Sequence, residues 1–81
     1  MIEFYTGKRE GYIYGYIFFS GRHKGLILDD GPNEYPIDSA ELLINGKFVF
    51  MENLTLELLK KKELYGSKAR IKQKQVAQFI N

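Results

Sequence analysis

The stretch Gly-Tyr-Ile-Tyr-Gly-Tyr-Ile-Phe-Phe at residues 11–19 is the strongest structural signal in the chain. β-Branched and aromatic residues favour strands, and this stretch contains little else besides glycine. Side chains of a strand alternate between its two faces. One face carries the aromatic set Tyr12, Tyr14, Tyr16 and Phe18, and the other carries Ile13, Gly15, Ile17 and Phe19. We therefore expect the isoleucines to fill a core and the tyrosines to offer flat, amphipathic rings to a partner.

The chain is short and lacks cysteine. Its 81 residues predict one small domain over residues 1–81, because a second hydrophobic core does not fit in this length. Without cysteine, disulfides and thiolate metal sites are excluded. The amino terminus has neither the basic nor the apolar region of a signal peptide, and no apolar run approaches the roughly 20 residues of a membrane span. We therefore expect a cytoplasmic protein without a membrane partner.

Charge is divided unevenly along the chain. Residues 1–59 hold five Lys/Arg against nine Asp/Glu, whereas residues 60–81 hold seven Lys/Arg against one glutamate. A basic end of this kind is typical of proteins that bind a polyanion or an acidic partner. It is equally typical of a solvated, lysine-rich surface that keeps a small protein in solution. The charge pattern alone leaves both interpretations open.

The first half of the chain reads as an antiparallel meander. A short strand is predicted to begin with Ile2 and Phe4 and to be broken at Gly7, before the long aromatic strand. Residues 21–25 form a basic turn between two glycines, residues 26–28 form a short apolar strand, and residues 29–33 are dense in turn-forming aspartate, glycine and proline. The segment 35–37 contains a proline and is predicted to be an edge strand.

The middle of the chain has two interpretations. Asp38 or Ser39 can cap a helical turn over residues 40–42. Alternatively, residues 41–44 form a strand that Asn45-Gly46 joins to a strand at residues 47–51, because Asn-Gly between apolar runs is a strong hairpin signal. Phe48 and Phe50 then share one face, which we expect to be buried.

The last third of the chain contains conflicting patterns. Leucines alternate with polar residues from Leu54 to Leu58, yet residues 57–64 are rich in helix formers and are followed by Gly66. We predict a strand at 54–65 that runs into a basic hairpin loop, followed by a return strand at residues 68–74. The leucines of this segment exceed what one strand face buries, which leaves apolar surface for a partner or a second copy. Val76, Phe79 and Ile80 have helical spacing and predict a closing helical turn.

Five short segments follow one another along the chain, at residues 15–19, 24–28, 34–40, 46–50 and 66–71. They resemble the successive motifs of the cold-shock domain, from its opening Gly-x-Val-Lys-Trp-Phe and Lys-Gly-Phe-Gly-Phe-Ile to its closing Gly-x-x-Ala-x-x-Val. The resemblance implies an all-β fold, a small five-stranded antiparallel barrel of the oligonucleotide-binding (OB-fold) kind. An SH3-like barrel is the alternative.

The resemblance also indicates where a binding face lies. The family binds RNA or DNA through aromatic residues on its second and third strands. At those positions this chain has Leu26, Leu28 and Ile37, and only Tyr35 is aromatic. We therefore expect the binding face on the aromatic first strand and on the basic return strand.

The predicted function is binding of single-stranded nucleic acid, RNA or DNA. A base that stacks on an exposed aromatic ring gains about 1–3 kcal/mol with little dependence on sequence, and basic side chains neutralise phosphates. The candidate residues are the aromatic Tyr12, Tyr14, Tyr16, Phe18 and Tyr35 and the basic or histidine side chains Arg22, His23, Lys24, Lys68, Arg70, Lys72 and Lys74.

A regulatory or inhibitory protein that docks on a larger protein through the tyrosine-rich face is the alternative function, since tyrosine and arginine are favoured at interface hot spots. A homodimer is a further possibility for the apolar surface. No enzyme activity, metal or cofactor is predicted. His23 is the only histidine and lies in a basic turn, and Asp29-Asp30-Gly31 is explained as a turn because its spacing to Asp38 does not match an EF-hand loop.

Overall fold

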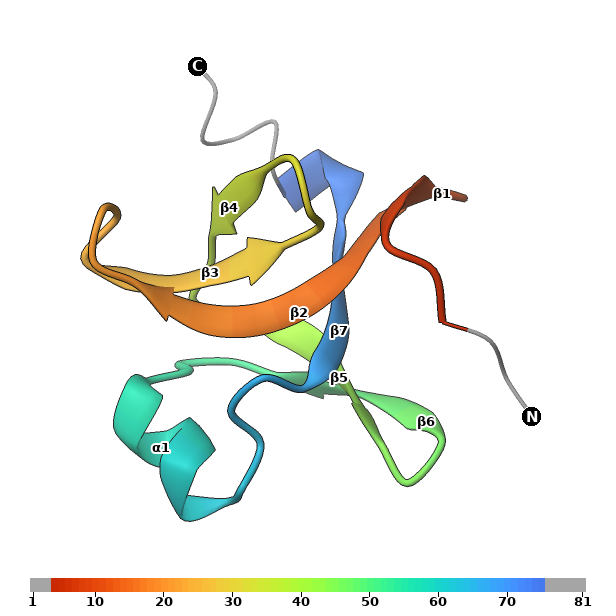
Figure 1. Cartoon of the computed structure of the whole chain (residues 1–81). Coiled ribbons are helices and arrows are strands. Elements are labelled where there is room, and N and C mark those ends of the chain that lie inside the picture. The colour runs from red at the N-terminus through yellow and green to blue at the C-terminus, as the bar shows by residue number, and fades with distance from the viewer. Residues whose placement is uncertain (1–3, 76–81) are drawn as a thin grey trace.

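The computed structural model describes residues 4–75, which form an antiparallel sheet, the helix α1 and a short helical segment at residues 73–75 (Figure 1). The strands are β1 (Gly7–Arg9), β2 (Tyr12–Ser20), β3 (Gly25–Asp29), β4 (Glu34–Pro36), β5 (Ala40–Ile44), β6 (Lys47–Met51) and β7 (Lys68–Lys72), and α1 spans Leu56–Lys61. Every strand pairing is antiparallel. The all-β prediction is therefore confirmed, as is the meander formed by β2, β3 and β4.

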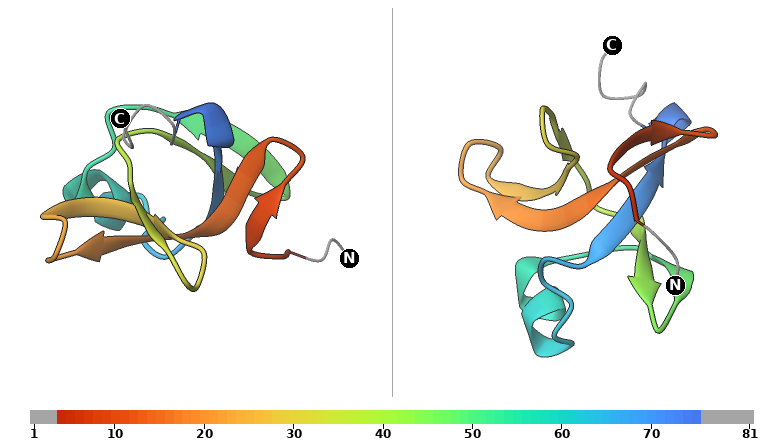
Figure 2. Two further views of the ribbon diagram at one scale, coloured as in Figure 1. Left: turned by 90° about the horizontal axis from the view of Figure 1, so that it is seen from above. Right: turned by 45° about the vertical axis from the view of Figure 1, so that its right-hand side comes forward.

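The long strand β2 is the centre of the sheet. One of its edges pairs with β7, whereas its other edge pairs first with β1 and then with β3. The partner changes around Gly15, where a Cβ atom would collide with the backbone carbonyl of Asp29. Only glycine lets the end of β3 approach this closely, and β2 curves along its length (Figure 2).

The prediction of a closed five-stranded barrel is not supported. The sheet has seven strands in the order β4-β3-β2-β7-β5-β6, with β1 as an additional partner of β2. Within residues 4–75 the outermost strands β4 and β6 do not pair with each other. β4 has only three residues, and its Pro36 has no N–H to extend a ladder. A hydrogen bond of 2.9 Å from the Leu54 N–H to the Asp38 carbonyl connects the segments that follow these two strands.

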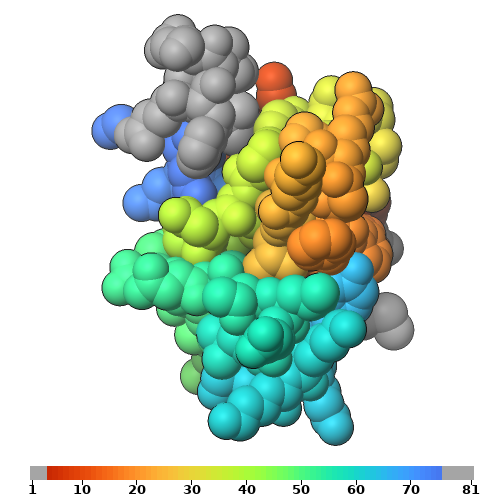
Figure 3. All heavy atoms as spheres, turned by 90° about the vertical axis from the view of Figure 1, so that its left-hand side faces the viewer, coloured from red at the N-terminus to blue at the C-terminus, as the bar shows by residue number. Residues whose placement is uncertain are grey.

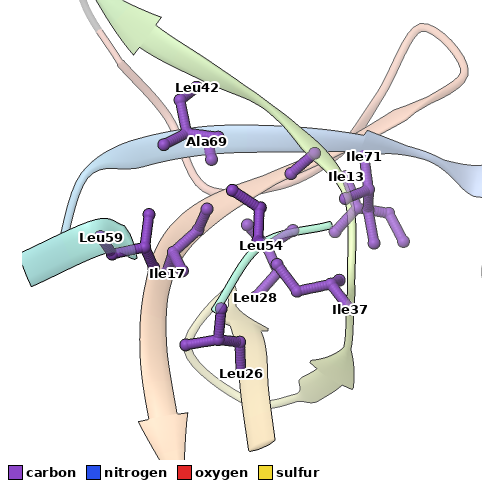
Figure 4. Packing of buried hydrophobic residues seen from close by; sticks show 11 residues of the cluster. Ile13, Ile17, Leu26, Leu28, Ile37, Leu42, Leu54, Leu59, Ala69 and Ile71 are labelled. Atoms are coloured by element: carbon purple, nitrogen blue, oxygen red, sulfur yellow. The ribbon is translucent and has the colours of Figure 1, made fainter. Parts of the chain in front are cut away.

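The core lies on the isoleucine side of β2 (Figure 4). Ile13 and Ile17 are fully buried, and they pack with residues from β3, β5, β7 and the region around α1. The predicted alternation of β2 is confirmed from Tyr12 to Ile17. It fails at Phe19, which was assigned to the core side and is 46% exposed. The core therefore ends before the end of the strand.

The prediction of a strand and a basic hairpin loop at residues 54–65 is wrong, because α1 occupies this segment. Thr55 caps the helix, since its Oγ1 accepts a hydrogen bond of 3.1 Å from the Leu58 N–H. Lys60 and Lys61 lie in the last turn, where positive charge interacts favourably with the helix dipole. Helical geometry turns the leucines of this segment inward, so Leu59 is fully buried and the others pack against the core. The segment therefore leaves less apolar surface than predicted, since Leu56, Leu58 and Leu64 are partly buried.

The hairpin at Asn45-Gly46 is confirmed, and the helical turn at residues 40–42 is not formed. Asn45 and Gly46 have φ values of 51° and 79°, the left-handed conformation of a tight type I′ turn. The prediction that Phe48 and Phe50 enter the core is wrong. Both lie on the face opposite the buried Leu42, and Phe50 is 61% exposed.

Three other boundaries differ from the predictions. The first strand begins at Gly7, the residue at which the predicted strand was expected to break, and residues 2 and 3 lie outside the described range. The return strand β7 ends at Lys72, so the predicted strand at residues 68–74 is two residues too long. The helical turn predicted around Val76, Phe79 and Ile80 falls outside the described residues. No helix within residues 4–75 is long and apolar enough to cross a membrane.

Candidate nucleic-acid interface

The aromatic strand β2 and the basic strand β7 are direct neighbours in the sheet. Residues that lie opposite each other in antiparallel strands project to the same face, with Cβ atoms about 4.5–5.5 Å apart. The opposed pairs are Tyr12–Lys72, Tyr14–Arg70 and Tyr16–Lys68. The register therefore joins the two predicted half-sites into one surface, on which a row of rings lies beside a row of basic side chains. We call these six residues the tyrosine–lysine face.

The rings along β2 form two pairs of similar spacing. The ring centroids of Tyr12 and Tyr14 are 6.1 Å apart, and those of Tyr16 and Phe18 are 6.4 Å apart. These values are close to the roughly 6.8 Å rise of two strand residues. The three tyrosines are half-buried, whereas Phe18 is 36% exposed. The row of aromatic rings predicted from the sequence, Tyr12, Tyr14, Tyr16 and Phe18, is therefore present. We call it the tyrosine ladder, and Phe18 at its end is its most accessible ring.

Arg70 occupies the centre of the face and is fully engaged by its neighbours. Its Nε and Nη2 both donate to Oε1 of Glu41, at 3.1 and 2.8 Å, and its Nη1 donates to the Tyr14 hydroxyl at 3.2 Å. The guanidinium carbon lies 4.0 Å from the ring centroids of both Tyr12 and Phe48. An arginine held between two rings and paired with a carboxylate is a structural element rather than a free phosphate ligand.

The electrostatics of Arg70 agree with this assignment. Burial alone lowers the pKa of the guanidinium, but its hydrogen bonds to Glu41 and to the Tyr14 hydroxyl reverse the effect, and the pKa is raised overall. The charge of Arg70 is balanced locally by Glu41. The positive charge that the face offers to a partner therefore comes from the exposed Lys68 and Lys72.

A residue from the amino-terminal segment covers part of the tyrosine ladder. The Phe4 ring packs edge-on against Tyr14 and Tyr16, with centroid distances of 6.0 and 5.6 Å. The Nζ of Lys68 lies 5.6 Å from the Phe4 centroid. Phe4 thus covers part of the ring surface on which a base would stack, and it competes for that surface.

Two hollows adjoin the Arg70 cluster. One, of 360 Å³, is lined by Phe4, Tyr14 and Phe48 together with Arg9 and backbone of the β5–β6 turn. The other, of 300 Å³, is lined by Arg70, Lys72 and Phe50 and by neighbouring residues of β5. Both contain aromatic and cationic side chains, which is the combination that holds a base and its phosphate, and each also contains a carboxylate, Glu10 in the first and Glu41 in the second.

The basic turn between β2 and β3 is not part of the tyrosine–lysine face. Arg22, His23 and Lys24 are exposed at the far end of β2, beyond the residues that pair with β7. The Nε2 of His23 lies 3.5 Å from Oε1 of Glu34, and this carboxylate also accepts a hydrogen bond of 3.3 Å from the Ser20 hydroxyl. The turn is therefore tied to the β4 edge of the sheet.

Two further candidates lie elsewhere. Tyr35, in β4, packs against the core, and its backbone partner is the fully buried Leu28. Burial first, and then the charge of nearby Asp30, raise the pKa of the Tyr35 hydroxyl. Lys74 follows the end of β7 in the short helical segment, so it does not extend the row of Lys68 and Lys72. Neither residue is brought to the tyrosine–lysine face.

Sequence reasoning missed the residues that complete the site. Glu41 was not singled out, although an acidic residue on a strand next to a basic strand is a signal for an ion pair once the register is known. Phe48 was assigned to the core. Phe4 was not recognised as a residue that packs on the middle of the aromatic row, nor Tyr65 as one that packs on its end at Phe18, with centroids 5.8 Å apart. These contacts join residues as far apart in the chain as Phe4 and Lys68, and they have no local signature.

Comparison with known proteins gives no relative. No protein-family model, curated protein or solved structure matches the chain.

Proposed function

We propose that the protein binds single-stranded nucleic acid, RNA or DNA, on the tyrosine–lysine face. The observation that supports the proposal is the β2–β7 register, which sets each of three tyrosines opposite a basic residue. Rings that stack bases and cations that follow the backbone are the two elements of sequence-independent single-strand binding. In this chain they alternate at about the spacing of successive nucleotides in an extended strand.

The residues of the face have different roles in this proposal. Tyr16 and Phe18 provide the stacking surface, because they lie at the accessible end of the ladder. Lys68 and Lys72 contact phosphates, since both are exposed. Arg70 positions the rings, because three of its N–H groups bond to Glu41 and to the Tyr14 hydroxyl and Glu41 balances its charge.

The test is a titration of fluorescently labelled single-stranded oligothymidine and oligouridine at several salt concentrations. The logarithm of the binding constant falls with the logarithm of salt by about 0.7 for each phosphate contacted on a single strand. The double variant Lys68→Gln/Lys72→Gln should flatten this slope by about 1.4. Both probes should respond alike, because the contacts are to the backbone.

A matched control removes the same charge elsewhere. Lys60 and Lys61 are exposed on α1, away from the β2–β7 pairing, so Lys60→Gln/Lys61→Gln should leave the slope unchanged. No binding by the wild type at low salt, or equal slopes for both double variants, would reject the proposal.

The cold-shock resemblance supports the proposal only through the aromatic first strand and the basic closing strand. The finer assignment to an oligonucleotide-binding barrel, or to its SH3-like alternative, stays a prediction. The seven-stranded path departs from the five strands of the family. The proposal rests on the face itself and not on the family.

A second candidate function is docking on a larger protein, and a specific surface favours it. Phe18, Phe19 and Tyr65 are 36%, 46% and 42% exposed. They are neighbours, because the Phe19 N–H donates to the Tyr65 hydroxyl at 2.9 Å and the Phe18 and Tyr65 rings are in contact. This aromatic cluster lies where the end of β2 meets the segment after α1 (Figure 3). Clustered exposed aromatic rings are typical of interface hot spots.

One experiment separates the two functions. Tagged protein is recovered from lysate with and without nuclease, as wild type and as Phe19→Ser/Tyr65→Ser. A stoichiometric protein that survives nuclease and is lost in the variant supports docking. Partners that are lost on nuclease treatment support nucleic-acid binding.

A further inference from the structure

The outer edge of β6 is an unpaired sheet edge. Within residues 4–75, β6 pairs only with β5. Its sequence Lys-Phe-Val-Phe-Met contains one charge and no proline, and its side chains are unusually accessible. Val49 is 43% exposed, and Phe50, at 61%, is the most exposed large apolar side chain in this part of the chain. An apolar, regular edge strand of this kind readily pairs with another strand.

The other edges of the sheet carry features that discourage such pairing. β1 has three residues, of which two are Lys8 and Arg9. β4 also has three residues and contains Glu34 and Pro36. Short length, charge and proline are the means by which proteins protect sheet edges. The central residues of β6 have none of these features, so β6, unlike β1 and β4, can readily pair with another strand.

The hairpin geometry decides which backbone groups of β6 are free. The two-residue loop Asn45-Gly46 closes on the pair Ile44–Lys47, and such a loop closes on a hydrogen-bonded pair. Hydrogen-bonded and non-bonded positions alternate along the strand, so Val49 bonds to β5. The N–H and C=O groups of Phe48 and Phe50 therefore point to the outer edge.

We propose that the chain forms a symmetric dimer in which β6 pairs antiparallel with β6 of a second copy, centred on Val49. In this register Phe48 lies opposite Phe50 of the partner subunit, and each such pair exchanges two backbone hydrogen bonds. In this register the free N–H and C=O groups of Phe48 and Phe50 on one edge therefore face the corresponding free groups on the partner subunit's edge.

The side chains also fit this register. Val49 lies opposite Val49 of the partner subunit, and aromatic residues face aromatic residues, which are favourable cross-strand pairs. Lys47 lies opposite Met51 of the partner subunit, so the two lysines stand at opposite ends of the pairing and no like charges meet. A second copy therefore complements the edge in hydrogen bonding and in apolar contact.

The test uses a charge swap at the dimer axis. Val49 opposite its own copy is a non-hydrogen-bonded pair, where side chains come closest. Val49→Lys and Val49→Glu should each weaken the dimer by about tenfold or more, because like charges then face each other. An equimolar mixture of the two variants should recover a dimer. Glu57→Gln, which changes the net charge by the same amount as Val49→Lys at an exposed position on α1, is the control and should dimerise as the wild type does.

Sedimentation equilibrium gives the mass, which for the wild type should rise with concentration from 9.4 kDa towards twice that value. Amide hydrogen exchange provides a second measurement that needs no variant. Exchange of the Phe48 and Phe50 amides should slow with increasing protein concentration, whereas that of the Val49 amide should not change. A monomer at all concentrations, a dimer unaffected by either charge, or concentration-independent exchange at Phe48 and Phe50 would overturn the proposal.

Discussion

Arg70 of β7 and Glu41 of β5 are cross-strand neighbours whose charged groups meet at 2.8 Å. The pair joins three strands, because Arg70 also bonds to the Tyr14 hydroxyl on β2. Both side chains are about one-fifth exposed, at 22% and 18%. A charge-assisted, partly buried arrangement of this kind holds the rings around it in place at the centre of the face.

We expect Arg70→Gln to lower the free energy of unfolding by about 2 kcal/mol, the usual magnitude for losing hydrogen bonds to a charged group. Arg70→Lys should not restore it, because an ammonium group lacks the planar fork and stacks poorly between two rings. Urea denaturation followed by circular dichroism measures the loss. Lys72→Gln, on the same strand but exposed, should stay within about 0.5 kcal/mol of the wild type. Equal stabilities of the Arg70 and Lys72 variants would contradict the structural role of Arg70.

Gly15 tests the close approach of β3 to β2. We expect Gly15→Ala to destabilise the protein by about 1–3 kcal/mol, the cost of forcing a methyl group into a packed site, because its Cβ meets the Asp29 backbone. Gly21→Ala is the matched control, since a Cβ at Gly21 meets no atom within 4 Å. Thermal unfolding of the two variants compares them directly. A Gly15 variant as stable as the Gly21 variant would contradict the close approach of β3 to β2 at Gly15.

Phe4 tests competition for the tyrosine ladder. Removing the ring in Phe4→Ala exposes the surfaces of Tyr14 and Tyr16 that it covers. We expect the variant to bind single-stranded oligonucleotide more tightly, by up to about 1 kcal/mol, the lower end of the range for one stacked base. Fluorescence anisotropy titrations at fixed salt provide the comparison. Weaker binding by Phe4→Ala would instead make Phe4 part of the binding surface.

Tyr35 makes the stability of the protein sensitive to alkaline pH. Its folded-state pKa is raised, first by burial and then by Asp30, so folding favours the protonated hydroxyl. The contribution is complete below about pH 10, the ordinary tyrosine value, and is lost as the pH rises through the raised folded-state pKa. We expect Tyr35→Phe to reduce the fall in melting temperature above pH 10. Parallel curves for the variant and the wild type would exclude Tyr35 as the source.

Local patterns were sufficient for part of the fold. The two-residue alternation of β2, the aspartate-rich turn after β3 and the Asn45-Gly46 hairpin were all predicted correctly. In the turn, Asp29 and Asp30 accept hydrogen bonds from the N–H groups of Gly31 and Asn33. Each of these features depends on residues within a few positions of one another, and their backbone preferences act over the same range.

The errors arose where two local patterns competed. Leucine alternation favoured a strand at residues 54–58, whereas Thr55 followed by helix formers favoured α1. The helix prevails because it buries Leu54 and Leu59 in the core and also directs three further leucines against it. Tertiary packing, rather than propensity, made that choice. Phe48 and Phe50 were misplaced for a similar reason, since a hairpin pattern does not say which of its faces meets the core.

By itself, the sequence determined that the chain is an antiparallel β protein with an aromatic face on one strand and a basic strand near its end, because side-chain alternation is a property of each strand alone. Only the tertiary structure decided that these two strands are neighbours, that Arg70 is held by Glu41 between rings, and that β6 pairs with β5 alone among the strands of residues 4–75. Strand order and register depend on contacts between residues far apart in the chain, and the local sequence does not encode their partners.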